Sequence, residues 1–410
     1  MRTSYESPNG QIRPKQIRNH WGIIELIVSR YFSKIHKGRL TVEFPSGACL
    51  EFVGIEPGPQ AFLKIKKFRL LPKMLFYGDL GMAESFMADD WNTTDLAKLL
   101  HLGDVNATAL KQVYVKTSIA RTLDRIRHRK RKNTPTGSRR NIASHYDLGN
   151  KFYCKWLDQS MSYSSALFKN FNETIEVAQR RKYLRIAEKI NLEPGQVVLE
   201  IGCGWGGFAE IAAAEFDCKV VGITLSKEQA AYTKTRMENL QLSDKVDVRL
   251  QDYRDVEGNF DKIVSIEMFE AVGEEYWHTY LDVIARCLKP DGQAALQIIT
   301  IDNDRYLTYR NNPEFIQRYI FPGGMLPSQL ALANAISLAK LKITDSFFFG
   351  KSYAETLRRW DQAFQVNWPE IKKLNFDERF YRMWRYYLCY CEVGFDRGAI
   401  DVGQFIIERE

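Results

Sequence analysis

The residues best suited to chemistry lie at 197–207, VVLEIGCGWGG, where a short apolar run ends in alternating glycines. The apolar run is typical of a buried parallel strand, and the apolar residues after Gly207 indicate a helix. Gly202 and Gly204 allow a tight turn and let a ligand come close to the backbone. We therefore expect this strand, turn and helix to bind a cofactor.

Glu200 distinguishes between two cofactors. Gly202, Gly204 and Gly207 also satisfy the glycine pattern of dinucleotide-binding sites. Glu200, however, places a carboxylate inside the strand, and this suits the ammonium and sulfonium groups of S-adenosylmethionine better than a pyrophosphate. The next strand, 219–224, ends without the acidic residue that binds the ribose of NAD. The sequence favours S-adenosylmethionine, and the remaining interpretation is a turn that only packs a helix on a strand.

The composition is that of an ordinary globular protein. The chain has 410 residues, 45% hydrophobic and 26% charged, which is enough for two domains with cores. Its seven cysteines are scattered without a C-x-x-C pair, which predicts reduced thiols in a cytoplasm and no metal site. No run of 18 apolar residues and no signal-peptide pattern occurs, so we expect neither a membrane span nor export.

The positive charge is concentrated at residues 121–140, which hold nine Lys or Arg and one acid, Asp124. The whole chain carries a formal charge of +8. Such a segment can bind an anionic membrane surface or nucleic acid, or it can be a solvated linker. No nucleic-acid-binding module accompanies it, so nucleic acid is the least favoured partner.

The basic segment separates two different parts of the chain. Residues 1–120 predict a small α+β domain without a catalytic constellation, and the pattern of 79–91 is less regular. Residues 141–410 predict an α/β domain with a doubly wound, mostly parallel sheet, because strand and helix patterns alternate. Ligands bind such sheets beyond the carboxyl ends of the strands. The expected strands are 39–44, 48–53 and 61–65 in the first domain and 197–201, 219–224, 246–250, 260–267 and 294–301 in the second; the expected helices are 96–102, 174–189, 227–239 and 276–288.

Several stretches after residue 141 resemble the cyclopropane-fatty-acyl-phospholipid synthase family, which includes the mycolic acid cyclopropane synthases. The resemblance implies a class I methyltransferase fold, and residues 1–120 are more loosely similar to the family's lipid-binding extension. The matching stretches are SHYDLGN (144–150), SYSSALF (162–168), LEIGCGWGG (199–207), GITLSKEQ (222–229), IVSIEMFEAVG (263–273), FIQRYIFPGGMLPS (315–328) and SYAETLRRW (352–360).

The resemblance also implies a reaction. In this family the cis double bond of a phospholipid acyl chain attacks the methyl group of S-adenosylmethionine and leaves a carbocation. A bound bicarbonate then takes a proton from the new methyl group, and a cyclopropane ring closes inside a dry apolar tunnel. We therefore expect a cytoplasmic enzyme, peripheral at the inner membrane surface, that acts on unsaturated phospholipid acyl chains at an anionic membrane.

The resemblance assigns site residues position by position. With Glu200, the expected cofactor-binding residues are Tyr163, Ser164, Gly202, Gly204, Thr224, Leu225, Gln229, Asp252, Tyr253 and Ile266. The expected catalytic residues around bicarbonate are Glu270, Ile299 and Tyr353, together with Ser165 and Gln297, which stand where the family has Cys and His.

The two departures leave the outcome of the reaction open. Ser165 and Gln297 can still donate hydrogen bonds to an anion such as bicarbonate, but Gln297 cannot carry a proton as His can. They are either drift in a cyclopropane synthase or a change that yields a methyl- or methylene-branched chain. We expect Ser165, Gln297, Glu270 and Tyr353 to face one cavity, with Glu270 as the only charged member, and Glu270→Gln to abolish turnover.

Two other functions stay open at this stage. One is methylation of a small soluble molecule, and the other is a lipid-binding relative without catalysis. The sequence does not determine the acyl chain, the headgroup or whether the chain forms a homo-oligomer.

Overall fold

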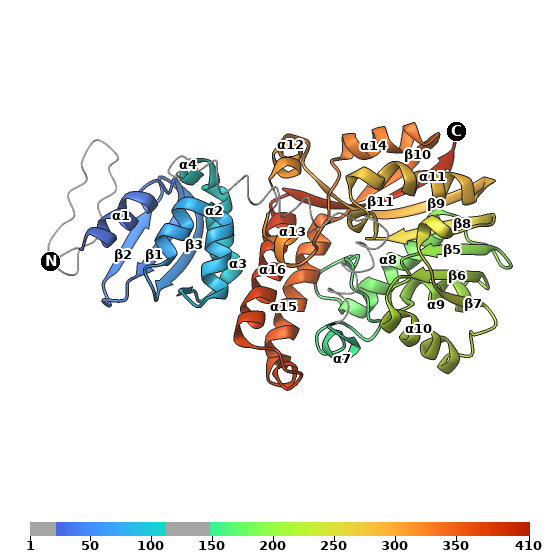
Figure 1. Ribbon diagram of the computed structural model, residues 1–410, viewed down its shortest axis with the longest axis horizontal. Coiled ribbons are helices and arrows are strands. Elements are labelled where there is room, and N and C mark those ends of the chain that lie inside the picture. The colour runs from blue at the N-terminus through green and yellow to red at the C-terminus, as the bar shows by residue number, and fades with distance from the viewer. Residues whose placement is uncertain (1–21, 112–147, 313) are drawn as a thin grey trace. The chain divides into compact units, whose positions relative to one another are not determined.

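The structure, a computed structural model, describes residues 22–111, 148–312 and 314–410, and the chain forms two compact units (Figure 1). The first unit combines residues 1–122 with 376–393, and the second combines 123–375 with 394–410. Helix α16 (Glu378–Asp396) therefore contributes residues to both units. The expected basic linker at 121–140 lies outside the described residues, so the predicted domain boundaries stay a prediction.

The first unit is built on a four-stranded sheet in the order β2-β1-β3-β4. Alternate residues of β1, including Leu40 and Val42, are buried, as a sheet with one covered face requires. The segment 79–91, whose sequence pattern is less regular, is helical as far as Met87, and Gly78 interrupts that helix with a non-helical backbone. The elements are α1 (Ile23–Phe32), β1 (Lys37–Glu43), β2 (Cys49–Val53), β3 (Glu56–Ile65), α2 (Leu70–Met87), β4 (Trp91–Asn92), α3 (Leu96–Val105) and α4 (Ala107–Lys111).

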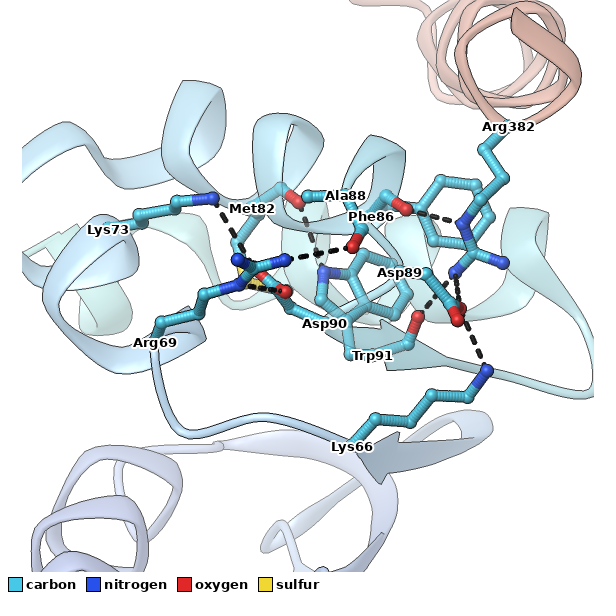
Figure 2. A network of polar contacts seen from close by, with 10 residues as sticks. All are labelled: Lys66, Arg69, Lys73, Met82, Phe86, Ala88, Asp89, Asp90, Trp91 and Arg382. Atoms are coloured by element: carbon cyan, nitrogen blue, oxygen red, sulfur yellow. Dashed lines mark hydrogen bonds and ion pairs between the residues drawn. The ribbon is translucent and has the colours of Figure 1, made fainter. Parts of the chain in front are cut away.

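Arg382 of α16 ties this helix to the rest of the first unit (Figure 2). Its guanidinium donates hydrogen bonds to the carbonyl oxygens of Phe86 and Trp91, the latter at 2.6 Å. It also lies 3.1 Å from Asp89 and 4.1 Å from the centre of the Phe86 ring. Residues nearly 300 positions apart in sequence therefore form one unit.

The second unit contains a seven-stranded sheet in the order β10-β11-β9-β8-β5-β6-β7. The neighbouring pairs from β9 to β7 are parallel, and β11 runs antiparallel to β9 and β10. The predicted α/β fold with a mostly parallel sheet is confirmed. The strands are β5 (Val197–Ile201), β6 (Lys219–Thr224), β7 (Val246–Leu250), β8 (Phe260–Ile266), β9 (Leu288–Ile301), β10 (Leu341–Phe348) and β11 (Ile400–Arg409).

Helices cover both faces of this sheet (Figure 1). Helices α8, α9 and α10 contribute Ile186, Phe208 and Met237 to one core, and α11 and α14 contribute Ile284 and Leu332 to the other. Within the described ranges, no helix is long and apolar enough to cross a membrane. The helices are α7 (Asn150–Tyr153), α8 (Ile175–Lys189), α9 (Gly207–Ala214), α10 (Lys227–Asn239), α11 (Trp277–Cys287), α12 (Asn303–Asn311), α13 (Phe315–Tyr319), α14 (Gln329–Leu338) and α15 (Gly350–Lys372).

The topology of the sheet indicates where a ligand binds. Strand β5 lies between β6 and β8, so the chain leaves β5 toward β6 and later returns to its other side at β8. In doubly wound sheets, ligands bind at the carboxyl ends of the strands beside this switch point. The carboxyl ends of β5, β6 and β8 are followed by Gly202, Leu225 and Glu267.

Candidate functional site

A cavity opens at this switch point and encloses about 940 Å³, its open mouth included. Its wall includes Gly202, Leu225 and Glu267, the residues that follow β5, β6 and β8. The cavity therefore lies where the sheet topology predicts a ligand.

The glycine turn after β5 forms one wall of the cavity. Gly202, Gly204 and Gly206 adopt φ angles of +83°, +52° and +83°, which residues with a side chain rarely adopt. The backbone N–H of Gly202 donates to the carbonyl oxygen of Ile223 on β6 at 3.0 Å. A Cβ atom on Gly204 would have no protein atom within 4 Å, so a side chain there would extend into open space beside the cavity.

Glu200 presents an unsatisfied carboxylate oxygen at the cavity. The side chain lines the cavity, is 3% exposed, and its Oε2 atom is buried without a hydrogen-bond partner among the described residues. Burial raises its pKa well above the ordinary value, and the ammonium group of Lys182 opposes that shift. A cationic ligand would satisfy this oxygen, so the site fits the ammonium and sulfonium groups of S-adenosylmethionine.

The structure brings together nearly all the predicted cofactor residues. Asp252 does not line the cavity, because its carboxylate accepts hydrogen bonds from Arg254 Nε at 2.8 Å and Nη2 at 2.9 Å. Gln251, which is not among the residues predicted from the sequence, lines the cavity instead. The predicted residues on the wall are Tyr163, Ser164, Glu200, Gly202, Gly204, Thr224, Leu225, Gln229, Tyr253 and Ile266.

A second carboxylate in the cavity wall is that of Glu267. It follows β8 directly, adopts a left-handed φ of +53°, and lines the cavity. Its Oε1 accepts hydrogen bonds from the backbone N–H of Ser165 and from Gln297 Nε2, each at 2.8 Å. Its Oε2 accepts from the hydroxyl of Tyr353 at 2.6 Å. Three of the predicted catalytic residues therefore converge on a carboxylate that was not predicted.

Glu270 makes a different contact. Its Oε1 accepts a hydrogen bond from the backbone N–H of Ile299, and its Oε2 is buried without a partner among the described residues. Burial, together with the charge of Glu267, raises the pKa of Glu270 to about 8. This raised pKa favours the protonated form of Glu270 at neutral pH, so the structure does not support the expectation that Glu270 is the charged residue of the site.

Glu267 is the better candidate for the charged carboxylate. Burial raises its pKa above the ordinary value, but its hydrogen-bond donors and the nearby ammonium group of Lys182 oppose that shift. Lys182 is fully buried and donates to Ser164 Oγ and Gln179 Oε1, each at 2.6 Å. Because the charge of Glu267 raises the pKa of Glu270, we expect one of the two carboxylates to hold a proton and the one with more donors to keep the negative charge.

This arrangement does not fit bicarbonate. The groups expected to bind the anion already bind carboxylates, since Ser165, Gln297 and Tyr353 donate to Glu267 and Ile299 donates to Glu270. The hydroxyl of Ser165 donates to the carbonyl oxygen of Ala166 at 3.0 Å, so only its backbone N–H reaches the site. None of the five predicted catalytic residues lines this cavity, whereas Glu267, which accepts hydrogen bonds from three of them, does.

The binding site leads to a first prediction. Gly204→Val should lower the affinity for S-adenosylmethionine by at least about tenfold, because a branched side chain would occupy the ligand's space. Gly398→Val is the matched control, since Gly398 also has a positive φ (+70°) and open surroundings but does not line the cavity. Calorimetric titration measures both. Equal affinities in the two variants would place the cofactor elsewhere.

Comparisons with known proteins agree with this site. A profile of the family described as mycolic acid cyclopropane synthetase matches residues 133–405. The chain is 37% identical to a cyclopropane-fatty-acyl-phospholipid synthase of Escherichia coli over 375 residues, which cover 90% of this chain and 93% of that protein. It is also 37% identical to the tuberculostearic acid methyltransferase UfaA1 of Mycobacterium tuberculosis over 348 residues, which cover 82% and 80%.

A solved structure shows the same fold. The crystal structure of mycolic acid cyclopropane synthase CmaA1 complexed with SAH and CTAB is 32% identical and has a TM-score of 0.63. It covers 66% of this chain, and 98% of that chain is matched. The resemblance noted in the sequence is confirmed. The chain belongs to the mycolic acid cyclopropane synthetase family and is an S-adenosylmethionine-dependent methyltransferase.

Proposed function

We propose that the enzyme methylates the double bond of an unsaturated phospholipid acyl chain and that Glu267 accepts the proton released from the new methyl group. The observation that carries this proposal is the Glu267 carboxylate, which lines the cofactor cavity and accepts three hydrogen bonds. The relatives named as acyl-phospholipid and mycolic acid synthases support a lipid substrate.

Glu200 and Glu267 have different roles in the proposed reaction. When bound, S-adenosylmethionine supplies the methyl group, which the acyl double bond takes up to leave a carbocation on the neighbouring carbon. Glu200 binds the cationic part of the cofactor, and Glu267 stabilises the acyl cation by its negative charge. Glu267 Oε then takes a proton from the new methyl group, and the electron pair of the broken C–H bond closes the ring on the cationic carbon. The product is a cyclopropane.

The hydrogen bonds of Glu267 also support a second product, a methylene-branched chain. Glu267 is fixed by three donors, and hydrogen bonds of this kind weaken a base, so the cation would persist longer before it loses the proton. A hydride can then shift from the methylated carbon to its neighbour. Loss of the same methyl proton to Glu267 then gives a methylene branch instead of a ring. The similarity to a tuberculostearic acid methyltransferase favours this branched product as the second candidate.

Product analysis tests the proposal. The purified enzyme is incubated with S-adenosylmethionine and vesicles of unsaturated phospholipid, and the lipids are analysed by mass spectrometry and proton NMR. Both products gain one CH₂ unit, and NMR separates ring methylene protons from those of an exocyclic methylene. An unchanged lipid mass, with methyl transfer to a small soluble acceptor, would replace the proposal by the alternative of a small-molecule methyltransferase.

The lipid substrate also requires access to a membrane. We propose that the basic segment 121–140, which lies outside the described residues, attracts the enzyme to anionic lipid. Replacing Arg129, Lys130, Arg131 and Lys132 with Gln removes half of the formal charge of +8. Vesicle sedimentation should then show weaker and less salt-dependent binding. Equal binding of both proteins to anionic vesicles would reduce the segment to a linker.

A further inference from the structure

The amide of Gln297 can face Glu267 in two ways, and only one of them is favourable. In the structure Gln297 Nε2 donates to Glu267 Oε1 at 2.8 Å. A rotation of the amide by half a turn would instead point Gln297 Oε1 at the carboxylate, where both atoms are acceptors. Because Gln297 is fully buried, water cannot compensate for the lost hydrogen bond. The orientation of this amide therefore matters for the proton acceptor.

A second buried amide lies directly behind the first. Gln404 on β11 is the register partner of Gln297 on β9 and is also fully buried. Its Nε2 donates to Gln297 Oε1 at 3.0 Å. Residues opposite each other in an antiparallel pair have side chains on the same face of the sheet, so this contact follows from the register. The orientation of Gln297 thus depends on that of Gln404.

Two groups that cannot change roles orient Gln404. Arg185 Nη1 donates to Gln404 Oε1 at 2.7 Å, and a guanidinium has no acceptor. On the other side, Gln404 Nε2 donates to the backbone carbonyl oxygen of Lys182 at 3.3 Å, and a carbonyl oxygen has no proton to give. Both contacts require the oxygen of Gln404 to face Arg185 and its nitrogen to face Gln297.

We propose that Arg185 is a positioning residue of the methyl-transfer site, which fixes the amide of Gln297 toward Glu267 through Gln404. Its effect is directional: Arg185 donates to Gln404, Gln404 donates to Gln297, and Gln297 donates to Glu267. We call this series of hydrogen bonds, from Arg185 through Gln404 and Gln297 to Glu267, the relay. Helix α8 supplies both Arg185 and Lys182, one turn apart, so a single helix orients the relay and places an ammonium group near Glu267. This inference rests on the proposed function of Glu267.

Loss of the relay should change the acidity of Glu267. The charged and titratable groups that act on this carboxylate are Lys182 of α8, Tyr353 of α15 and Glu270. Removal of Arg185 leaves all three in place and leaves Gln404 oriented only by its 3.3 Å contact with the carbonyl oxygen of Lys182, so the two amides rotate more easily. A Gln297 that no longer donates ceases to favour the ionised form, so the acid limb of the pH–rate profile should move to higher pH.

The test compares Arg185→Met with a matched control. Arg185→Met removes the donor and keeps most of the aliphatic stem, and Arg185→Lys restores one donor. We expect kcat of Arg185→Met to fall about tenfold and its acid limb to rise by about one pH unit, with partial recovery in Arg185→Lys. The KM for S-adenosylmethionine should not change. Asp345→Asn removes the ion pair of Arg185, which is 3.4 Å long, but leaves the relay intact, so it should behave as the wild type.

A double-mutant comparison shows whether Arg185 acts through Gln297. In a Gln297→Met background, Arg185→Met should produce no further shift of the acid limb. An equal shift in both backgrounds, or no shift in Arg185→Met, would overturn the proposal. Gln404→Met breaks the relay from inside and serves if Arg185→Met does not fold. Failure of the proposed function is a separate result, because the wild type would then leave lipid unmethylated or Glu267→Gln would keep the activity of the wild type.

Discussion

Glu267→Gln is expected to lower kcat by about 1,000-fold, in the range observed for the loss of a positioned general base. The amide has nearly the shape of the carboxylate but accepts no proton and carries no negative charge to stabilise the acyl cation. The affinity for S-adenosylmethionine should stay close to that of the wild type, because Glu200 and the glycine turn are unchanged. Single-turnover kinetics with lipid vesicles and calorimetric titration measure the two effects.

Glu270→Gln is the matched control for this substitution. With a pKa of about 8, Glu270 is mostly neutral at pH 7, and Gln resembles a protonated carboxyl group that still accepts from Ile299 N–H. We expect its kcat to fall by less than about tenfold. The resemblance to the family predicts the larger effect at Glu270, so the ranking of the two variants decides between the two residues. A larger loss in Glu270→Gln would return the role to that residue.

The pH dependence of turnover and of stability tests the same assignment, in which Glu267 is the charged carboxylate and Glu270 the protonated one. The pKa of Glu267 is raised above 4.5, so turnover should fall as the pH drops through this raised value and Glu267 becomes protonated. Glu270 has a folded-state pKa of about 8, so the stability that its protonated form contributes is lost as the pH rises from about 4.5 to about 8. Glu270→Gln should remove this loss, and its Tm should depend less on pH in that window.

Glu267→Gly is expected to abolish turnover and to make it recoverable by small planar anions. Removal of the carboxylate frees the donors of Ser165, Gln297 and Tyr353. Glycine suits the left-handed φ of +53° at this position, so the fold should be preserved. Added bicarbonate or formate should restore turnover by about 100-fold, as a positioned base contributes about that much or more.

The wild type supplies the control for this rescue. Because Glu267 already uses the donors, turnover of the wild type should not change when dissolved bicarbonate is removed or added. Ser165 and Gln297, which stand where the family has Cys and His, would then occur together with a base that the protein itself supplies in place of bicarbonate. A wild type that requires bicarbonate, or a Glu267→Gly variant that no anion restores, would contradict the role of Glu267.

Much of the second unit could be predicted from the sequence, because hydrophobic patterns and glycine positions are local signals. The strands 219–224 and 246–250 and the helix 227–239 have the bounds expected. The glycine turn and Glu200 were found for the same reason, since a strand with a carboxylate before a glycine cluster is visible in eleven residues. The helix in 79–91 was missed because Gly78 interrupts the helical pattern, and the buried side of α2 becomes apparent only in the folded unit.

Glu267 shows why the rest could not be predicted. Its donors come from Ser165, Gln297 and Tyr353, which are 102, 30 and 86 positions away in sequence. No periodicity reports such distances, and the resemblance directed attention to the family's position at Glu270. One local signal was present, because Glu267 is an acidic residue directly after a parallel strand, at the edge where ligands bind. The relay from Arg185 was invisible, since its steps need the register of β9 and β11.

The division of helix α16 between the two units has a consequence for the evolution of this chain. The polypeptide builds most of the first unit, then the second, returns to the first with residues 376–393, and ends in the second. A gene fusion that added residues 1–122 to an ancestral methyltransferase would not by itself have supplied Arg382, the donor to Phe86 and Trp91. Acquisition or loss of the N-terminal part would therefore make or break the contacts of Arg382 on the last helix.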